Sequence, residues 1–171
     1  INGGALQDYT NYTYPLNNLV DDDVQTFISS NSLLKPWLAA NGGELAPWID
    51  VSVTDDGTPA TVGGVQISIQ ETYNKPVDFS ILASEDGQNW TTCKQLKDYD
   101  WGETTSQLFT FTPVSASKLR IQVRDLDGQQ EGLPLYFRLT ELEAYAPTGF
   151  VDMGRVIYVQ ANNSETYTPT G

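Results

Sequence analysis

Three adjacent carboxylates, Asp21, Asp22 and Asp23, are followed three residues later by the hydroxyl of Thr26. Neighbouring like charges repel one another, so a folded loop tolerates them best when a cation lies among them. Calcium is a hard cation that takes about 6–8 oxygen ligands from carboxylates, hydroxyls and carbonyls. The stretch is therefore a candidate calcium site. The spacing alone favours the alternative, an acidic, solvated loop between two strands.

The overall charge limits the partners of the protein. Nine lysines and arginines stand against 22 aspartates and glutamates, which gives a formal net charge of −13 in 171 residues. Nucleic acids and anionic membranes both require cationic surfaces. We therefore expect no nucleic-acid partner and no membrane-lipid partner, and the length suits one domain with a short tail.

Histidine is missing from the sequence, and Cys93 is the single cysteine. This removes histidine-based triads, the commonest zinc ligand and any internal disulfide. We interpret Cys93 as a small buried hydrophobe, because no histidine can activate it. Acid pairs such as Glu141 and Glu143 lack a context that would raise a pKa or form a pocket, so the prediction is a protein that is not an enzyme.

Much of the chain has the alternating pattern of β-strands. Apolar and polar residues alternate at 65–70, 79–83 and 119–124, with Gly, Pro, Asn and Asp turns between the runs. Several short alternating strands without helical periodicity are typical of an all-β sandwich or barrel. Trp48 and Trp90 lie in such runs, and we expect both in the core.

The last alternating run contains a change of register. Apolar residues occupy odd positions up to Leu139 and even positions from Leu142 onward. Because the side-chain period of a strand is two, this change requires one extra residue. We predict a β-bulge at Thr140 and Glu141, which would turn these two residues away from the regular ladder.

Together, four pieces of the chain resemble discoidin domains, also called coagulation-factor C-type domains. The acidic stretch is similar to the Asp-Gly-Asn/Asp-x-x-Thr-x-Trp motif of that family, although Asp22 replaces the glycine and Phe27 and Ile28 stand where the motif has tryptophan. Segments similar to the first long strand, the Ser-x-Asp-Gly-x-x-Trp hairpin and the closing strands follow at residues 47–51, 79–90, and 118–121 with 139–145.

The resemblance implies an all-β fold, an eight-stranded jelly-roll β-sandwich of the galactose-binding-domain type, over residues 1–147. Residues 148–171 would be a linker or the first strand of a following domain. It also implies a structural calcium ion that ties the acidic loop to the last strand. Carried over position by position, its ligands would be Asn18, Asp21, Asp23, Thr26, Thr140 and Glu141.

Bacterial members of this family resemble family 32 carbohydrate-binding modules, which implies a glycan ligand held by loops at one end of the sandwich. Stacking on sugar needs aromatic rings, and sugar hydroxyls need polar groups. The predicted ligand-binding residues are Trp37, Tyr73, Asn74, Trp101, Arg124 and Tyr136, with Lys75, Tyr99, Asp100 and Glu131 nearby.

For Trp37 and Trp101, anchoring of the loop is an equal alternative to sugar binding. The competing function is a structural spacer or a protein–protein interaction domain without a sugar site. In either case we expect a module of a larger, multidomain protein that is extracellular, on the cell surface or periplasmic.

Overall fold

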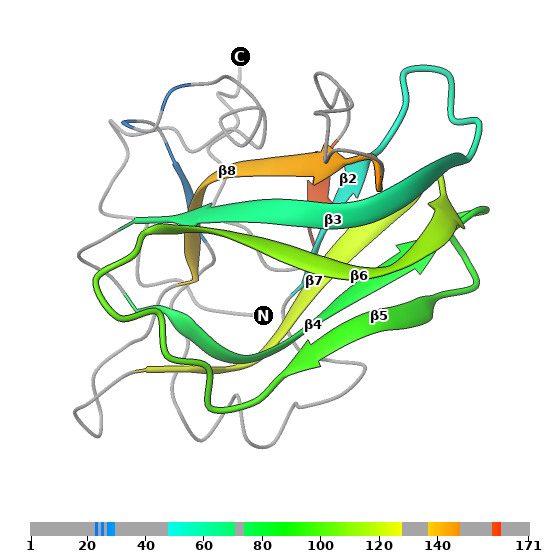
Figure 1. Cartoon of the computed structure of the whole chain (residues 1–171). Coiled ribbons are helices and arrows are strands. Elements are labelled where there is room, and N and C mark those ends of the chain that lie inside the picture. The colour runs from blue at the N-terminus through cyan, green and yellow to red at the C-terminus, as the bar shows by residue number, and fades with distance from the viewer. Residues whose placement is uncertain are drawn as a thin grey trace, which may run out of the picture.

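The computed structural model describes residues 23, 25, 27–29, 48–70, 74–127, 137–147 and 159–161, and all regular structure within them is β-strand. These strands form two sheets that face each other (Figure 1). The described residues include no helix that could cross a membrane.

Within the described part of the chain, one sheet has four strands and the other has five. The four-stranded sheet has the order β1 (Ile28–Ser29), β8 (Arg138–Tyr145), β3 (Ala60–Ile69) and β6 (Ser106–Ala116). The five-stranded sheet has the order β5 (Thr91–Leu96), β4 (Pro76–Ser84), β7 (Lys118–Leu126), β2 (Trp48–Ser52) and β9 (Val159–Ala161). All described pairings are antiparallel, so the predicted all-β sandwich is confirmed.

The hydrophobic core lies between the two sheets, because alternate residues of each strand point inward. Ile67 of β3 is fully buried, as are Phe79 and Ile81 of β4 and Ile121 of β7. Each Å² of apolar surface that such side chains remove from water stabilises the fold by about 25 cal/mol. The alternation read from the sequence therefore places the core correctly on these strands.

The predicted β-bulge is confirmed. Ser68 of β3 pairs with Glu141 of β8, but the next residue, Ile69, pairs with Leu139. Thr140 is the extra residue, and it allows both Leu139 and Leu142 to remain in the core. Thr140 and Glu141 are themselves buried.

The C-terminal segment differs from expectation at three residues. Val159–Ala161 form β9, which pairs with β2 in the same sheet through Ile49, Asp50 and Val51. These residues therefore extend the sandwich. The boundary predicted at residue 147 stays a prediction, because most of residues 148–171 lie outside the described part of the chain.

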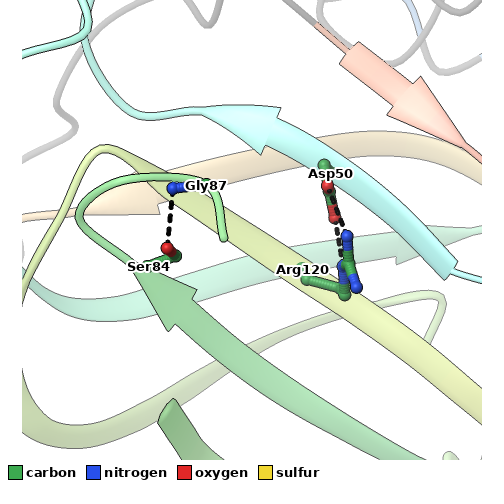
Figure 2. A network of polar contacts seen from close by, with 4 residues as sticks. All are labelled: Asp50, Ser84, Gly87 and Arg120. Carbon is green, nitrogen blue, oxygen red and sulfur yellow. Dashed lines mark hydrogen bonds and ion pairs between the residues drawn. The ribbon is translucent and has the colours of Figure 1, made fainter. Parts of the chain in front are cut away.

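Trp48 and Trp90 are half-buried on the outer face of the five-stranded sheet, so their expected place in the core was wrong. The guanidinium of Arg120 lies between them, with its Cζ atom 3.9 Å from the Trp48 ring centroid and 4.1 Å from that of Trp90. Arg120 also holds Asp50 by two hydrogen bonds of 2.6 and 2.9 Å (Figure 2). Cation–π attraction and charge pairing thus join β2, β7 and the β4–β5 hairpin.

Gly63 allows the segment that follows β8 to approach β3. A Cβ atom at this position would lie 2.5 Å from the Cα of Pro147, a backbone atom that cannot move alone. We expect Gly63→Ala to lower the free energy of unfolding by about 1–3 kcal/mol through overpacking, as measured by urea denaturation. Thr61→Ala, at an exposed position of the same strand, is the control, and equal stability losses would contradict the prediction.

Candidate functional site: a pocket among loops at one end of the sandwich

Three chain segments meet around a pocket of about 330 Å³. They are the entry to β4, the connection between β5 and β6, and the end of β7. Its lining residues are Lys75, Val77, Asp98, Tyr99, Asp100, Trp101, Gly102 and Asp127. A concave site with aromatic walls and a few polar groups is the usual form of a small-molecule site.

Trp101 forms part of the pocket wall but is only 5% exposed. Its indole Nε1 donates a hydrogen bond of 2.8 Å to the carbonyl of Pro76. The expectation that Trp101 offers an open stacking face is therefore wrong, and the loop-anchoring alternative describes its position. Trp101 does line the pocket, and its part in ligand binding stays a prediction.

An aromatic cluster joins the pocket wall to the hydrophobic core. Tyr99 lies 5.3 Å from Trp101 and 5.2 Å from Phe109 between ring centroids, in edge-to-face arrangements. Phe79 of β4 completes the cluster, 5.6 Å from Phe109. Such pairs add about 0.5–1.5 kcal/mol each beyond their burial. The wall is thus fixed by the core and is formed before any ligand arrives.

Backbone hydrogen bonds tie the three segments together. The amide of Lys75 donates to Asp127 Oδ1 at 2.6 Å, and the amide of Asp127 donates to the carbonyl of Lys75 at 2.9 Å. The Lys75 ammonium donates a hydrogen bond of 3.1 Å to the carbonyl of Gly102. The Tyr99 amide donates one of 2.9 Å to the carbonyl of Val77. A rim held in this way loses little conformational entropy on binding.

The β5–β6 connection makes its turn with unusual backbone angles. Asp98 has a φ of 49° and Gly102 a φ of 58°, both in the left-handed region that aspartate and glycine tolerate best. Asp100 Oδ1 accepts the Gly102 amide at 2.8 Å. Burial, and then the negative charge of Asp100, raise the pKa of Tyr99, so its hydroxyl stays protonated as a hydrogen-bond donor.

The predicted ligand-binding residues have different outcomes. Arg124 is not among the residues that line the pocket, and its Nη1 instead donates to Ser80 Oγ at 2.6 Å. Asn74 immediately precedes the lining residue Lys75 but does not line the pocket. Trp37, Tyr73 and Tyr136 lie outside the described residues, so their assignment to the site stays a prediction.

Sequence reasoning named Lys75, Tyr99 and Asp100 only as neighbours of the site, and it missed Asp98 and Asp127. The signal for both was present. Asp98 follows β5 and Asp127 follows β7, and both lie where a strand gives way to a loop. What the sequence did not contain was the pairing that brings these two strand ends together.

The predicted calcium ligands are described only in part. Glu141 is 4% exposed, and its Oε1 accepts a hydrogen bond of 3.0 Å from the backbone amide of Asp23. This contact joins the acidic stretch to the bulge in β8 across 118 positions, and the calcium site itself stays a prediction. Asn18, Asp21 and Thr26 lie outside the described residues, and the described residues alone do not gather three acidic, cysteine or histidine side chains.

The Cys93 side chain is half-buried and packs against the core from the irregular position in β5. Burial raises the pKa of the Cys93 thiol to about 11. At neutral pH it is therefore a thiol, and a thiol is a poor nucleophile. This agrees with its interpretation as a hydrophobic side chain.

The sequence matches the F5/8 type C domain family over residues 5–138, and the chain belongs to this family. No curated protein is significantly similar to it. The family assignment confirms the discoidin resemblance and agrees with the two-sheet fold.

Several solved structures share the fold. Chitosan-binding module 1 from a Paenibacillus sp. IK-5 chitosanase/glucanase is 22% identical with a TM-score of 0.56, covering 78% of this chain and 86% of that one. The CBM32 module of AlyQ, in complex with 4,5-unsaturated mannuronic acid, is 19% identical with a TM-score of 0.55, covering 75% and 84%. A family 89 glycoside hydrolase from Clostridium perfringens matches at 20% identity and a TM-score of 0.54, covering 78% of this chain but 13% of that enzyme.

Proposed function

We propose that the protein is a carbohydrate-binding module, and that sugar binds in the loop pocket beside Tyr99 and Trp101. The observation that carries the proposal is the pocket itself: a preformed hollow of about 330 Å³ with an aromatic wall, a lysine and three carboxylates. Sugar rings have apolar faces that pack on aromatic carbons, and hydroxyls that bond to charged groups.

Similar structures support this proposal. The Paenibacillus module is named for chitosan binding, and the AlyQ module contains a bound sugar acid. The third structure is an enzyme in which the similar part is a small fraction of the chain. We infer from them a binding role and not a catalytic one. We also infer an extracellular or surface location and a place in a larger, multidomain protein.

The buried position of Trp101 favours the spacer alternative, since it leaves one aromatic platform fewer. The pocket beside it favours sugar binding. A test must therefore address the pocket without disturbing the fold. Gly102 offers this, because it lines the pocket, has a positive φ and has open space where a Cβ would lie.

We expect Gly102→Asn to weaken sugar binding at least about tenfold, equal to 1.4 kcal/mol, by placing a side chain in the pocket mouth. Asparagine is suited to the left-handed backbone. Wild type would first be screened on a glycan array, and the affinity for the best ligand would then be measured by calorimetry.

Gly57→Asn is the matched control, because Gly57 also has a positive φ of 78° and open space around it, but it lies in the β2–β3 turn. It should bind as wild type does. A blank array would refute the sugar-binding proposal in favour of the spacer. Equal affinities of the two variants would place the site elsewhere.

We further propose that a structural calcium ion joins the acidic stretch to β8. The ligands are the six predicted from the family resemblance, of which Asp23, Thr140 and Glu141 are described. Support comes from the buried Glu141 carboxylate, its bond to the Asp23 amide and the bulge that turns Thr140 out of the ladder. The ion would lower the repulsion among the carboxylates and hold the loop.

Calcium should raise the melting temperature relative to chelated protein, since a ligand at about 100 times its Kd adds roughly 2.7 kcal/mol of stability. Glu141→Gln keeps the acceptor for Asp23 but removes a charge, and it should abolish most of this shift. Glu143→Gln on the same strand is the control and should retain it. An unchanged melting temperature in wild type would refute the calcium site.

A further inference from the structure

We propose that the pocket selects sugars that carry a protonated amino group, such as oligomers of 2-amino sugars, over neutral and acidic sugars. This rests on the proposed function, because it names the ligand class of the same pocket. The argument is the balance of charge around a hollow whose shape is already fixed by the core.

Among the described residues that line the pocket, the charged groups are three carboxylates and one ammonium. Asp98, Asp100 and Asp127 stand against Lys75, so these described lining residues carry a net charge of −2. The Lys75 ammonium donates to the carbonyl of Gly102, which holds its charge at the rim against the backbone. A bound cation therefore meets more attraction than repulsion.

Lys75 is the only basic residue among the described residues that line the pocket. Lys97 is the first residue of the β5–β6 connection but is not one of them. The segments that continue the chain from the pocket, residues 71–73 and 128–136, contain the glutamates Glu71 and Glu131 and no lysine or arginine. The net charge of −13 adds a general field of the same sign.

The carboxylates are oriented by the backbone. Asp100 Oδ1 accepts the Gly102 amide at 2.8 Å and Asp127 Oδ1 accepts the Lys75 amide at 2.6 Å. Each bond occupies one oxygen in a fixed direction and positions the carboxylate at the pocket wall. Asparagine can accept the same bonds, so Asp→Asn removes charge while it preserves the loop.

The test compares soluble oligomers of glucosamine and galactosamine with their N-acetylated forms and with oligogalacturonate, by calorimetry at mildly acidic pH. The free and acetylated sugars share a backbone and differ in charge. We expect the free amino sugar to bind at least about fivefold more tightly at low salt, and the difference to shrink as salt screens the charges. Asp100→Asn and Asp127→Asn should each reduce affinity for the amino sugar about two- to fivefold, and the loss for the acetylated sugar should be smaller.

Asp56→Asn is the control. Asp56 also accepts hydrogen bonds from its own loop, at the amide and hydroxyl of Thr58, but it lies in the turn between β2 and β3 and does not line the pocket. Equal or tighter binding of the acetylated or acidic oligomers would overturn the inference while sugar binding in the pocket still stands. Loss of binding to every sugar, here and on the array, would refute the proposed function itself.

Discussion

Arg120→Met should destabilise the protein by about 3–5 kcal/mol, which is a large part of the stability of a domain of this size. The side chain of Asp50 is 5% exposed, and Arg120 is its ion-pair partner at 2.6 Å. Methionine keeps the apolar stem between Trp48 and Trp90 but leaves the buried carboxylate without its counter-charge. Urea denaturation at neutral pH measures the loss.

Acidification should reverse part of this effect. Burial raises the pKa of Asp50, and the hydrogen bonds and charge of Arg120 offset part of that increase. Without Arg120 the pKa of the folded state rises further above that of the unfolded chain. An acid with a raised folded-state pKa is most stabilising below its unfolded pKa and loses that contribution as pH rises through the folded value. The gap between variant and wild type should therefore narrow as pH falls.

The double variant Asp50→Val/Arg120→Met is the control for this interpretation. Replacing both members of a buried pair with apolar residues is often close to neutral. The double variant should therefore be more stable than Arg120→Met alone. If it is less stable by the sum of two single losses, the pair does not carry the effect and stacking on the tryptophans does.

Trp101→Ala should cost about 3–5 kcal/mol of stability, since a large buried ring leaves a cavity beside the aromatic cluster. It also removes the donor to the Pro76 carbonyl. Trp101→Phe keeps most of the ring contacts and should cost less, with the lost hydrogen bond contributing about 0.5–1.5 kcal/mol. Denaturant unfolding of both variants measures the order.

Trp90→Ala is the comparison, because this ring is half-buried on the outer face. It should cost less than Trp101→Ala, and the reverse order would contradict the assigned positions. The result also decides how binding experiments are designed. A binding loss in Trp101→Ala would report a disturbed loop, whereas Gly102→Asn leaves the aromatic cluster in place.

Much of the sandwich could be predicted from local patterns. Period-two alternation identified the inward face of β3, β4 and β7, and the slip between Leu139 and Leu142 identified the bulge. These features are local consequences of strand geometry. The same alternation indicates the outer face for Trp48. Trp48 lies two positions from Asp50, which points outward, and next to Ile49, which points into the core.

The site could be predicted less well, because it depends on contacts between distant segments. Trp101 lies among glycine and aspartate, which favours an exposed loop, yet its partner is a carbonyl 25 positions away. Asp127 meets Lys75 across 52 positions. No local pattern encodes such pairings. The acidic stretch was different, since its carboxylates and the bulge in β8 each gave a signal, and Asp23 does contact Glu141.

The pairing of β9 with β2 also covers one edge of β2. With Val159–Ala161 in place, three residues of β2 are bonded on both sides. A chain cut at residue 147 would leave that edge of β2 with unpaired amide and carbonyl groups, the kind of edge that recruits strands from other molecules. A short segment far from the pocket would then decide whether the domain stays monomeric in solution.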